Sequence, residues 1–368
     1  MKTVILTDAK YRSAISAARS FARGRYRVVA VQSRGDTGVT PPVFSSRCVA
    51  ETRWLDGSAA DGAYPERLLA LLREYDHPVL FPVGAATLTV ISRARETFAP
   101  WCDFLVAPSD VLDAVNDKEA VHQRALALGL PVPAEYAGAP DRYPVVVKPR
   151  CGEKYGLTAA DRYVIARDKS ELDAALTAMK RYDPAPIVQE KIAGDGNSAC
   201  VLLGRDGQLL DAFCHRRIRE YPISGGPSAC CESVYDAKKI DAAHRLLQSF
   251  GFVGLAMAEF KGDRILEVNP RVWGSFPLTT LAGSPITLRY AEAAAGESVI
   301  YHPQNYQTGV RMRFLLNDTL ATLSLLRHGR LREAGAGFAD MLRAREALSD
   351  RDDPAPMRAY LKATVLKR

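Results

Sequence analysis

The chain has 368 residues, which suggests two or three domains and is long enough to bury a substantial core. Apolar residues at 47% and charged residues at 25% are ordinary for a soluble globular protein, and no run of 18 or more apolar residues could span a membrane. The net charge of +7 favours anionic partners such as nucleotides, phosphates or carboxylates. No block of like charges stands out, so we expect neither a nucleic-acid nor a membrane partner.

The seven cysteines are an odd number without CxxC spacing. This pattern indicates free thiols in a reducing compartment, without disulfides or a structural zinc site. The N-terminus begins a strand at once and shows no apolar stretch of a secretory signal. Together these features predict a cytoplasmic protein.

The first third of the chain alternates short apolar strands with helices. Strands are predicted at Thr3–Thr7, Arg27–Gln32 and Pro78–Val83, with helices at residues 12–23, 64–74 and 85–97. A βαβ beginning predicts a small parallel sheet, and the absence of GxGxxG gives no support for dinucleotide binding. We expect this domain to close near residue 107.

Later segments predict a small α+β unit, then strands, then helices. The unit has a helix near 118–129, strands at 145–149 and 163–165, and a helix at 169–181. The strand Ile187–Glu190 opens a third section, and beyond Gly309 the pattern turns helical, with a break at 352–356. The predicted domains are residues 1–107, 108–186, 187–309 and, as a helical extension, 310–368.

A predicted β-hairpin near residue 260 carries the most informative polar residues in the chain. Glu267 and Asn269 are two residues apart on one strand and point to one face, and Glu259 precedes the turn. A loop of two or four residues would turn Glu259 away from Glu267, so we expect an odd loop, such as residues 262–264 with a bulge. These oxygen ligands suit Mg²⁺ held together with phosphates, and Arg271 can neutralise a phosphoryl group in transfer. Taken alone, the pattern also fits an exposed hairpin with solvated acids.

Lys118 opens the helix of the second section. Asn116 or Asp117 can cap this helix, which places Lys118 in its first turn. A cation there opposes the helix dipole and is unfavourable unless an anion lies nearby. Its position therefore makes Lys118 a candidate phosphate ligand.

Lys148 ends an apolar Val-Val-Val strand, and Pro149 then starts a loop. Gly152 and Gly156 in this loop let backbone amides approach an anion closely, and Lys154 adds a positive charge. The strand and its loop therefore predict a second phosphate site, although a routine hairpin connection has similar residues.

The segment after Ile187 runs from a strand into a Gly-Asp-Gly turn. An exposed strand edge can offer one carbonyl and one amide to an adenine, and a polar side chain in the turn can bind hydroxyl groups. The candidates for the adenine are Gln189, Glu190 and Ile192. For the ribose the choice between Asp195 and Asn197 stays open, and an ordinary turn has the same sequence.

A cationic strand end and a flexible loop cover His215–Ser228. Arg217 and Arg219 would share one face of the strand and Arg216 the other, so at most two of them can reach one site. Guanidinium groups pair well with a carboxylate substrate. The candidate substrate ligands are Arg216, Arg217, Ser224 and Gly225. His215 is a candidate base, but a lone histidine is more often structural.

Taken in order, these segments resemble the ATP-grasp superfamily, in particular its carboxylate–amine ligases related to carbamoyl phosphate synthase and biotin carboxylase subunits. The resemblance covers a pre-grasp domain, a small lid domain and a catalytic domain with a metal-binding hairpin. The helical region after Gly309 lies outside it. It implies an ATP-grasp fold of α/β and α+β units with a Rossmann-like N-terminal domain, and ATP and Mg²⁺ as cofactors.

The resemblance also assigns roles to the nucleotide site. Lys118 and Lys148 match the two lysines that bind ATP phosphates, and Gly152–Thr158 matches the glycine-rich lid loop. This loop is poorer in Gly and Ser than is typical of the family. The adenine-binding linker matches Gln189, Glu190 and Ile192, with a ribose contact at or near Asp195.

For the metal site the resemblance assigns Glu259, Glu267 and Asn269 as Mg²⁺ ligands and Arg271 as the arginine of the transition state. The implied reaction is ADP-forming: a substrate carboxylate becomes an acyl phosphate, and an amine then displaces phosphate. Bicarbonate activation with carboxylation or carbamoyl transfer is the alternative enzyme, and a nucleotide-sensing regulator the alternative without catalysis. The expected partners are a small-molecule carboxylate and amine, and a homodimer is a further possibility.

Overall fold

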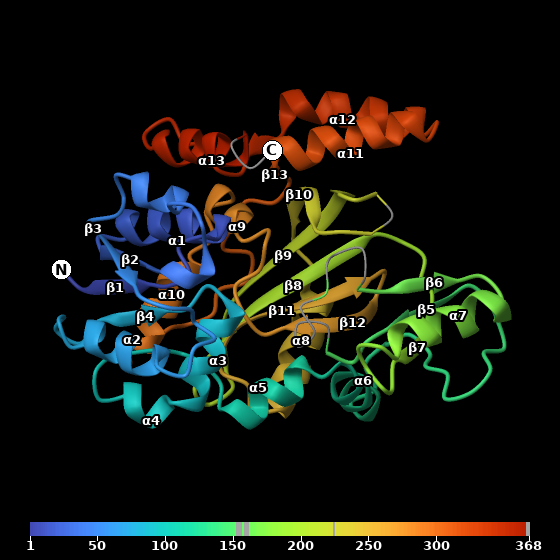
Figure 1. The fold of residues 1–368 in the computed structure, drawn as a ribbon, viewed down its shortest axis with the longest axis horizontal. Coiled ribbons are helices and arrows are strands. Elements are labelled where there is room, and N and C mark those ends of the chain that lie inside the picture. The colour runs from blue at the N-terminus through green and yellow to red at the C-terminus, as the bar shows by residue number, and fades with distance from the viewer. Residues whose placement is uncertain (152–156, 158–161, 224, 366–368) are drawn as a thin grey trace.

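The computed structural model describes residues 1–151, 157, 162–223 and 225–365, organised around three β-sheets. In Figure 1 the N-terminal sheet, the long strands of the largest sheet and the smallest sheet follow one another across the molecule. Helices cover the faces of the sheets, and a layer of C-terminal helices lies along one side. No helix in these described ranges is both long and apolar enough to cross a membrane.

Four parallel strands in the order β3-β2-β1-β4 form the N-terminal sheet. Helices alternate with these strands because parallel neighbours need crossover connections. The elements are β1 (Thr3–Leu6), α1 (Arg12–Arg23), β2 (Arg27–Ser33), β3 (Glu51–Leu55), α2 (Tyr64–Leu72), β4 (Val79–Phe81), α3 (Ala85–Arg93) and α4 (Arg95–Phe98), with 3-10 turns at Arg34–Asp36 and Pro42–Ser45. The predicted parallel α/β beginning is therefore confirmed.

The smallest sheet is antiparallel, in the order β6-β5-β7. Its elements and the two helices before them are α5 (Ser109–Asn116), α6 (Lys118–Ala127), β5 (Val145–Lys148), β6 (Val164–Ala166), α7 (Lys169–Met179) and β7 (Ile187–Glu190). We expected β7 to open the third section. The structure differs, because β7 pairs along its whole length with β5, and a boundary at residue 187 would cut this sheet.

Seven strands in the order β12-β11-β8-β9-β10-β13-β14 form the largest sheet. Its principal elements are β8 (Gly196–Leu203), β9 (Leu209–Glu220), β10 (Ser228–Val234), α8 (Ala237–Ser249), β11 (Gly254–Lys261) and β12 (Arg264–Asn269). One face packs with Cys200, Leu202 and Phe213 into a core shared with the N-terminal sheet. The opposite face packs with Ala199 and Val201 against α8. This shared core fixes the position of β11 and β12.

The chain after β12 returns to the N-terminal domain and then to the large sheet. Its elements are α9 (Pro277–Leu281), α10 (Ile286–Ala294), β13 (Arg311–Arg313), α11 (Leu315–Arg327), α12 (Leu331–Arg343), β14 (Arg345–Glu346) and α13 (Ala355–Val365). The region after Gly309 is therefore not the purely helical extension that we expected. Two short strands on either side of the α11–α12 hairpin join the sheet edge at β10.

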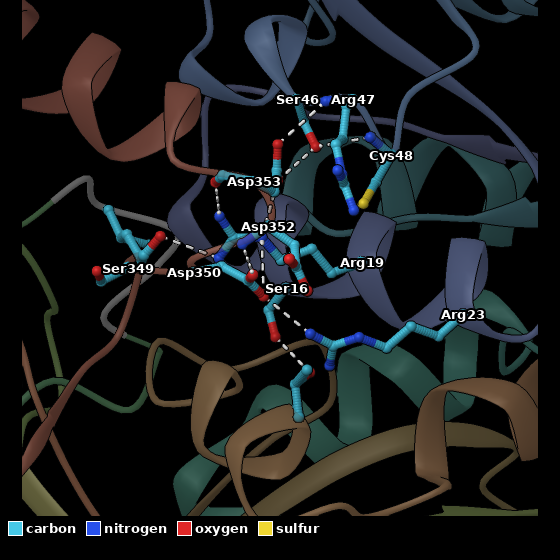
Figure 2. A network of polar contacts seen from close by, with 12 residues as sticks. Ser16, Arg19, Arg23, Ser46, Arg47, Cys48, Ser349, Asp350, Asp352 and Asp353 are labelled. Atoms are coloured by element: carbon cyan, nitrogen blue, oxygen red, sulfur yellow. Dashed lines mark hydrogen bonds and ion pairs between the residues drawn. The ribbon is translucent and has the colours of Figure 1, made fainter.

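A buried ion pair ties the C-terminal segment to α1 (Figure 2). The Asp353 carboxylate accepts hydrogen bonds from Arg19 Nε at 2.9 Å, Ser46 Oγ at 2.7 Å and the Arg47 amide at 3.0 Å. The Arg19 guanidinium also donates to the carbonyls of Leu348 at 2.9 Å and of Asp353 at 2.7 Å. Both charges are therefore well satisfied although they lie 334 positions apart in the sequence.

Candidate functional site: a carboxylate pair ringed by cations

The β11–β12 hairpin brings its two glutamates directly opposite each other. Lys261 pairs with Arg264 across a two-residue turn, so the odd loop that we expected is wrong. The register shifts farther along, and Glu259 pairs with Glu267 because Leu266 forms a β-bulge between the two pairs. The bulge, and not the length of the turn, places both carboxylates on one face of the sheet.

The same bulge makes a contact with the small sheet. The Leu266 carbonyl accepts a hydrogen bond from Lys148 Nζ at 3.3 Å. Lys148 is the last residue of β5, and its side chain is only 8% exposed. The bulge therefore aligns the carboxylates and also holds the lysine beside them.

Lys118 reaches the same carboxylates from α6. Its Nζ lies 3.1 Å from Glu267 Oε2. Asp117, and not Asn116, caps the helix by accepting from the amides of Glu119 and Ala120. The Lys118 amide donates to the Arg150 carbonyl at 3.1 Å, which joins the start of α6 to the segment after β5. Both predicted phosphate-binding lysines thus converge on one place.

Glu259 is surrounded by donors. Arg217 Nη2 lies 3.4 Å from Glu259 Oε2, and Asn269 Nδ2 lies 3.1 Å from Glu259 Oε1. Arg271 Nη2 in turn donates to Asn269 Oδ1 at 3.3 Å. The predicted set of Glu259, Glu267, Asn269 and Arg271 therefore forms one contiguous cluster.

The electrostatics of the pair are asymmetric. Burial and the neighbouring Glu267 raise the pKa of Glu259, against the attraction of Arg217. Burial also acts on Glu267, but the charges of Lys118 and Lys148 outweigh it and lower its pKa. Burial lowers the pKa of Lys148 to about 8, although Glu267 favours its charged form. The cluster therefore combines a carboxyl whose pKa is raised with one whose pKa is lowered.

The three arginines of β9 go to three different places. The register places Ser198 opposite both His215 and Glu259, so Arg217 shares the face of Glu259 and Arg216 lies on the other face. Arg216 pairs there with Glu232 at 2.7 Å, so the structure does not bring this predicted substrate ligand to the site.

Arg219 corrects a second expectation about this strand. We expected it to share a face with Arg217, but the register shifts between the two residues and leaves Ile218 as an extra residue. Arg219 therefore turns to the opposite side and binds Asp318 at 2.7 Å and Asp340 at 2.8 Å. It is a structural residue that connects β9 to α11 and α12.

The predicted adenine linker is held by polar side chains that sequence reasoning missed. Gln189 is buried, and its side-chain amide donates to the Glu135 carboxylate. The other oxygen of this carboxylate lies 3.3 Å from His122 Nδ1. The Glu190 carboxylate pairs with Arg264 of the hairpin at 2.9 Å, and the backbone amide of Glu190 donates to the Ala134 carbonyl. These contacts join β7 to the hairpin and fix the strand edge next to the carboxylate pair. The short segment around residue 135 carried no motif that would have pointed to it.

Beyond β7, the two ribose candidates differ in their surroundings. Asp195 is exposed, and its carboxylate lies 4.0 Å from Arg216. Asn197 lies on the sheet face opposite to Glu259, and its side chain donates to the Asp195 carbonyl. Ile192 lies between β7 and this turn, outside both strands.

Four predicted ligands, Gly152, Lys154, Gly156 and Ser224, lie outside the described residues. Gly225 is described, with φ of +137°, and a Cβ at this position would lie 1.5 Å from the Tyr163 hydroxyl. Only glycine fits so close to Tyr163, which directly precedes β6 of the small sheet. The candidate substrate loop therefore touches the predicted lid.

His215 is enclosed and holds a loop. It is 2% exposed, and its Nε2 lies 2.9 Å from the Ser275 hydroxyl. Burial lowers its pKa to about 3, so the ring is neutral at physiological pH. A buried neutral histidine that touches the chain just after Arg271 fits a structural role better than that of a base.

The polar groups of the hairpin fit a divalent cation. Within the described ranges no group of three or more His, Cys, Asp or Glu side chains gathers as a metal site. The candidate oxygen donors on the hairpin are the two carboxylates and the Asn269 amide oxygen. Like charges placed directly opposite on neighbouring strands destabilise a sheet, and a cation between Glu259 and Glu267 would relieve this. Hard oxygen donors of this kind suit Mg²⁺.

Comparison with known proteins adds to this geometry. Residues 115–275 match the ATP-grasp domain family. The chain is similar to biotin carboxylase from Campylobacter jejuni, with a TM-score of 0.62, 14% identity and coverage of 84% of this chain and 74% of the other. For the biotin carboxylase domain of the Hydrogenobacter thermophilus 2-oxoglutarate carboxylase these values are 0.63, 15%, 84% and 73%. For N5-carboxyaminoimidazole synthetase from Staphylococcus aureus they are 0.59, 15%, 84% and 80%.

These likenesses confirm the fold class predicted from the sequence. The chain therefore has the ATP-grasp fold, and its residues 115–275 match the ATP-grasp domain family.

Proposed function

We propose that this protein is an ATP-dependent, ADP-forming ligase that activates a carboxylate as an acyl phosphate and joins it to an amine. One observation carries the proposal: Lys118, Lys148, Arg217 and Arg271 converge from four separate segments on one pair of facing carboxylates. A triphosphate, a divalent cation and a carboxylate together need such an alternation of charges. The ATP-bound or ADP-bound biotin carboxylases of similar fold are consistent with it.

In the proposed mechanism Lys118 and Lys148 bind phosphate oxygens. Both ammonium groups already lie at the edge of the cluster, where a phosphate can replace the contacts to Glu267 and to the Leu266 carbonyl. Glu259, Glu267 and Asn269 would hold Mg²⁺, which when bound neutralises phosphate charge. Arg271 is held beside Asn269, in a place to stabilise charge on the transferring phosphoryl group.

Arg217 is our proposed ligand for the substrate carboxylate. It lies between Glu259 and the loop after β9, where it donates to the Gly226 carbonyl at 3.2 Å and to the Ser228 hydroxyl at 3.1 Å. A carboxylate oriented by Arg217 attacks the γ-phosphorus in line, and the bond to the bridging oxygen breaks with its electron pair leaving on ADP. An amine then attacks the acyl carbon, loses a proton and expels inorganic phosphate.

The test is release of ADP in a screen of carboxylic acids against amines, with AMP measured in parallel. We expect ADP and phosphate only when an acid and an amine are both present. The matched variants are Glu267→Gln, which should lose the activity, and Asp263→Asn, which changes an exposed acid on the same hairpin and should keep it.

Other outcomes of this screen would identify a different function. ADP release with bicarbonate and no organic acid would indicate carboxylation or carbamoyl transfer. ATP binding without turnover for any pair would favour a nucleotide-sensing regulator. AMP and pyrophosphate as products would contradict acyl-phosphate chemistry.

A further inference from the structure

The α11–α12 hairpin differs from a helix pair that only covers a sheet, because its buried face carries few large apolar side chains and its exposed face carries several. Its inward face is small or polar: the buried residues are Asp318, Ala321, Thr322, Leu325, Ala334, Gly337 and Asp340. Leu325 is the one large apolar side chain among them. The two aspartates bind Arg219 of β9, so ion pairs and small residues, and not a hydrophobic stripe, hold the hairpin to the sheet.

Five large apolar side chains of the hairpin are exposed. Five of the eleven exposed large apolar residues among those described lie on it: Leu323, Leu326, Leu331, Phe338 and Leu342. Leu331 is 65% exposed and Leu342 is 91% exposed. Leu331, Phe338 and Leu342 recur at helical spacing and form one stripe along α12. Such a concentration of exposed apolar side chains marks an interaction surface.

Positive charge frames this apolar surface. The exposed charged residues from 323 to 345 are Arg327, Arg330, Arg332, Glu333, Arg343 and Arg345. Glu333 is the single acid among them, and it already pairs with Arg330 at 2.7 Å. Of the whole sequence, residues 310–368 hold twelve Lys or Arg against seven Asp or Glu, so this section carries +5 of the net charge of +7.

We propose that the outer face of the α11–α12 hairpin docks on an anionic lipid bilayer. Leucine and phenylalanine would enter the interface, and the flanking arginines would contact lipid phosphates, as in other basic amphipathic helices. Figure 1 shows that α11 and α12 lie side by side at the edge of the molecule, with α13 in the same layer. Our sequence analysis expected no membrane partner because it found neither a long apolar run nor a block of like charges.

Two other occupants fit the surface less well. A second copy of this chain would place arginines against arginines, and Glu333 is the one exposed acid available to pair with them. A protein partner would need a groove complementary to the apolar side chains of two helices, whereas a fluid interface accepts them without a matching shape. Charge complementarity therefore favours the anionic bilayer.

The experiment is co-sedimentation of the full chain with vesicles of phosphatidylcholine alone or with about 30% phosphatidylglycerol. We expect binding to the anionic vesicles only, and a loss of binding as salt rises from ~0.05 M to ~0.5 M. Leu331→Ser with Leu342→Ser should lower the bound fraction about tenfold. Ile300→Ser is the matched control because Ile300 is 68% exposed outside the hairpin.

A charge variant tests the second half of the proposal. Arg332→Gln with Arg343→Gln should weaken anionic binding about 30-fold, which corresponds to ~1 kcal/mol for each cation near the surface. The control removes two exposed cations elsewhere, Arg167→Gln with Lys169→Gln. Thermal unfolding should show that all variants fold, since the changed side chains are exposed.

Three outcomes would overturn the proposal. The wild-type chain could fail to sediment with anionic vesicles at low salt, or the leucine variant could bind as well as Ile300→Ser. Alternatively, sedimentation velocity could show a concentration-dependent dimer that the leucine variant abolishes, which would make this face a protein interface. ADP release in solution is measured separately, so failure here leaves the proposed reaction untouched.

Discussion

Two charge clusters in this molecule differ in how far their side chains are exposed to solvent. In the Arg19–Asp353 pair the side chains are 5% and 3% exposed and lie 2.9 Å apart. In the Arg217–Glu259 pair they are 25% and 23% exposed and lie 3.4 Å apart. The first pair is enclosed, whereas the second is about a quarter exposed, and Arg217 also pairs with Glu220 at 3.1 Å.

The difference separates charges that hold the fold from charges that we propose meet a substrate. A buried pair is tolerated when every donor and acceptor is used, and then removal of one partner is costly. At the carboxylate pair two like charges face each other, and the pKa of Glu259 is raised while that of Glu267 is lowered. Such opposed shifts are typical of sites where an ion or ligand completes the charge balance.

The largest expected effect is the loss of activity when a carboxylate of the more exposed cluster is removed. Glu267→Gln should lower Mg²⁺-dependent ADP release by on the order of 1000-fold or more, because it removes one metal ligand and the partner of Lys118. Urea unfolding should change little. Normal turnover in this variant would refute the metal assignment, and Asp263→Asn serves as the control.

A substitution in the enclosed Arg19–Asp353 pair should lower stability and leave activity unchanged. Asp353→Ala leaves the Arg19 guanidinium buried without its carboxylate, and we expect the free energy of unfolding to fall by about 3 kcal/mol. Urea denaturation measures this change, and ADP release per folded molecule should stay constant. A change in stability below ~1 kcal/mol would show that the pair is not a fold-holding contact.

Arg217 and Arg219 allow both behaviours to be tested two positions apart on one strand. Arg219→Gln leaves Asp318 and Asp340 without their shared cation, so it should lower stability by about 3 kcal/mol and spare the KM for ATP. Arg217→Gln should lower kcat/KM about 100-fold, at a cost in stability near 1 kcal/mol. If both variants lose stability alone, Arg217 is structural and the substrate assignment is wrong.

The smallest effect concerns pH. Lys148, with a pKa of about 8, is protonated below pH 8 and loses its charge as the pH rises through that value. Because the charged form binds phosphate, the KM for ATP should rise up to about tenfold between pH 7 and pH 9. Lys148→Ala should raise the KM about tenfold at pH 7 and abolish this dependence. A wild-type KM that is constant over this range would contradict the role of Lys148.

Local patterns in the sequence were sufficient for much of this site. The hairpin with Glu259 and Glu267, and the lysine at the end of an apolar strand, are short-range features with a clear residue order. The turn length was wrong because a bulge leaves no signal in a strand as regular as Arg264–Asn269. The same limitation misplaced Arg219, which changes face through a single unpaired residue.

Long-range contacts and very short strands lay beyond the sequence. Arg19 belongs to a helix with no nearby acid in its sequence, and its partner comes 334 residues later. β13 and β14 have three and two residues, too few for an alternating pattern to be recognised, so their region seemed entirely helical. Packing against an existing sheet edge, and not their own composition, makes them strands.

The bulge at Leu266 also separates the turn of the hairpin from the part that carries Glu259 and Glu267. Because register is reset between the turn and the glutamates, residues added at Gly262 and Asp263 would lengthen the tip without rotating either carboxylate. Loss of one residue from the strand itself would send Glu267 to the opposite side. The tip is therefore a tolerant place for a fluorescent label that reports nucleotide binding, since the Asp263 side chain is 89% exposed.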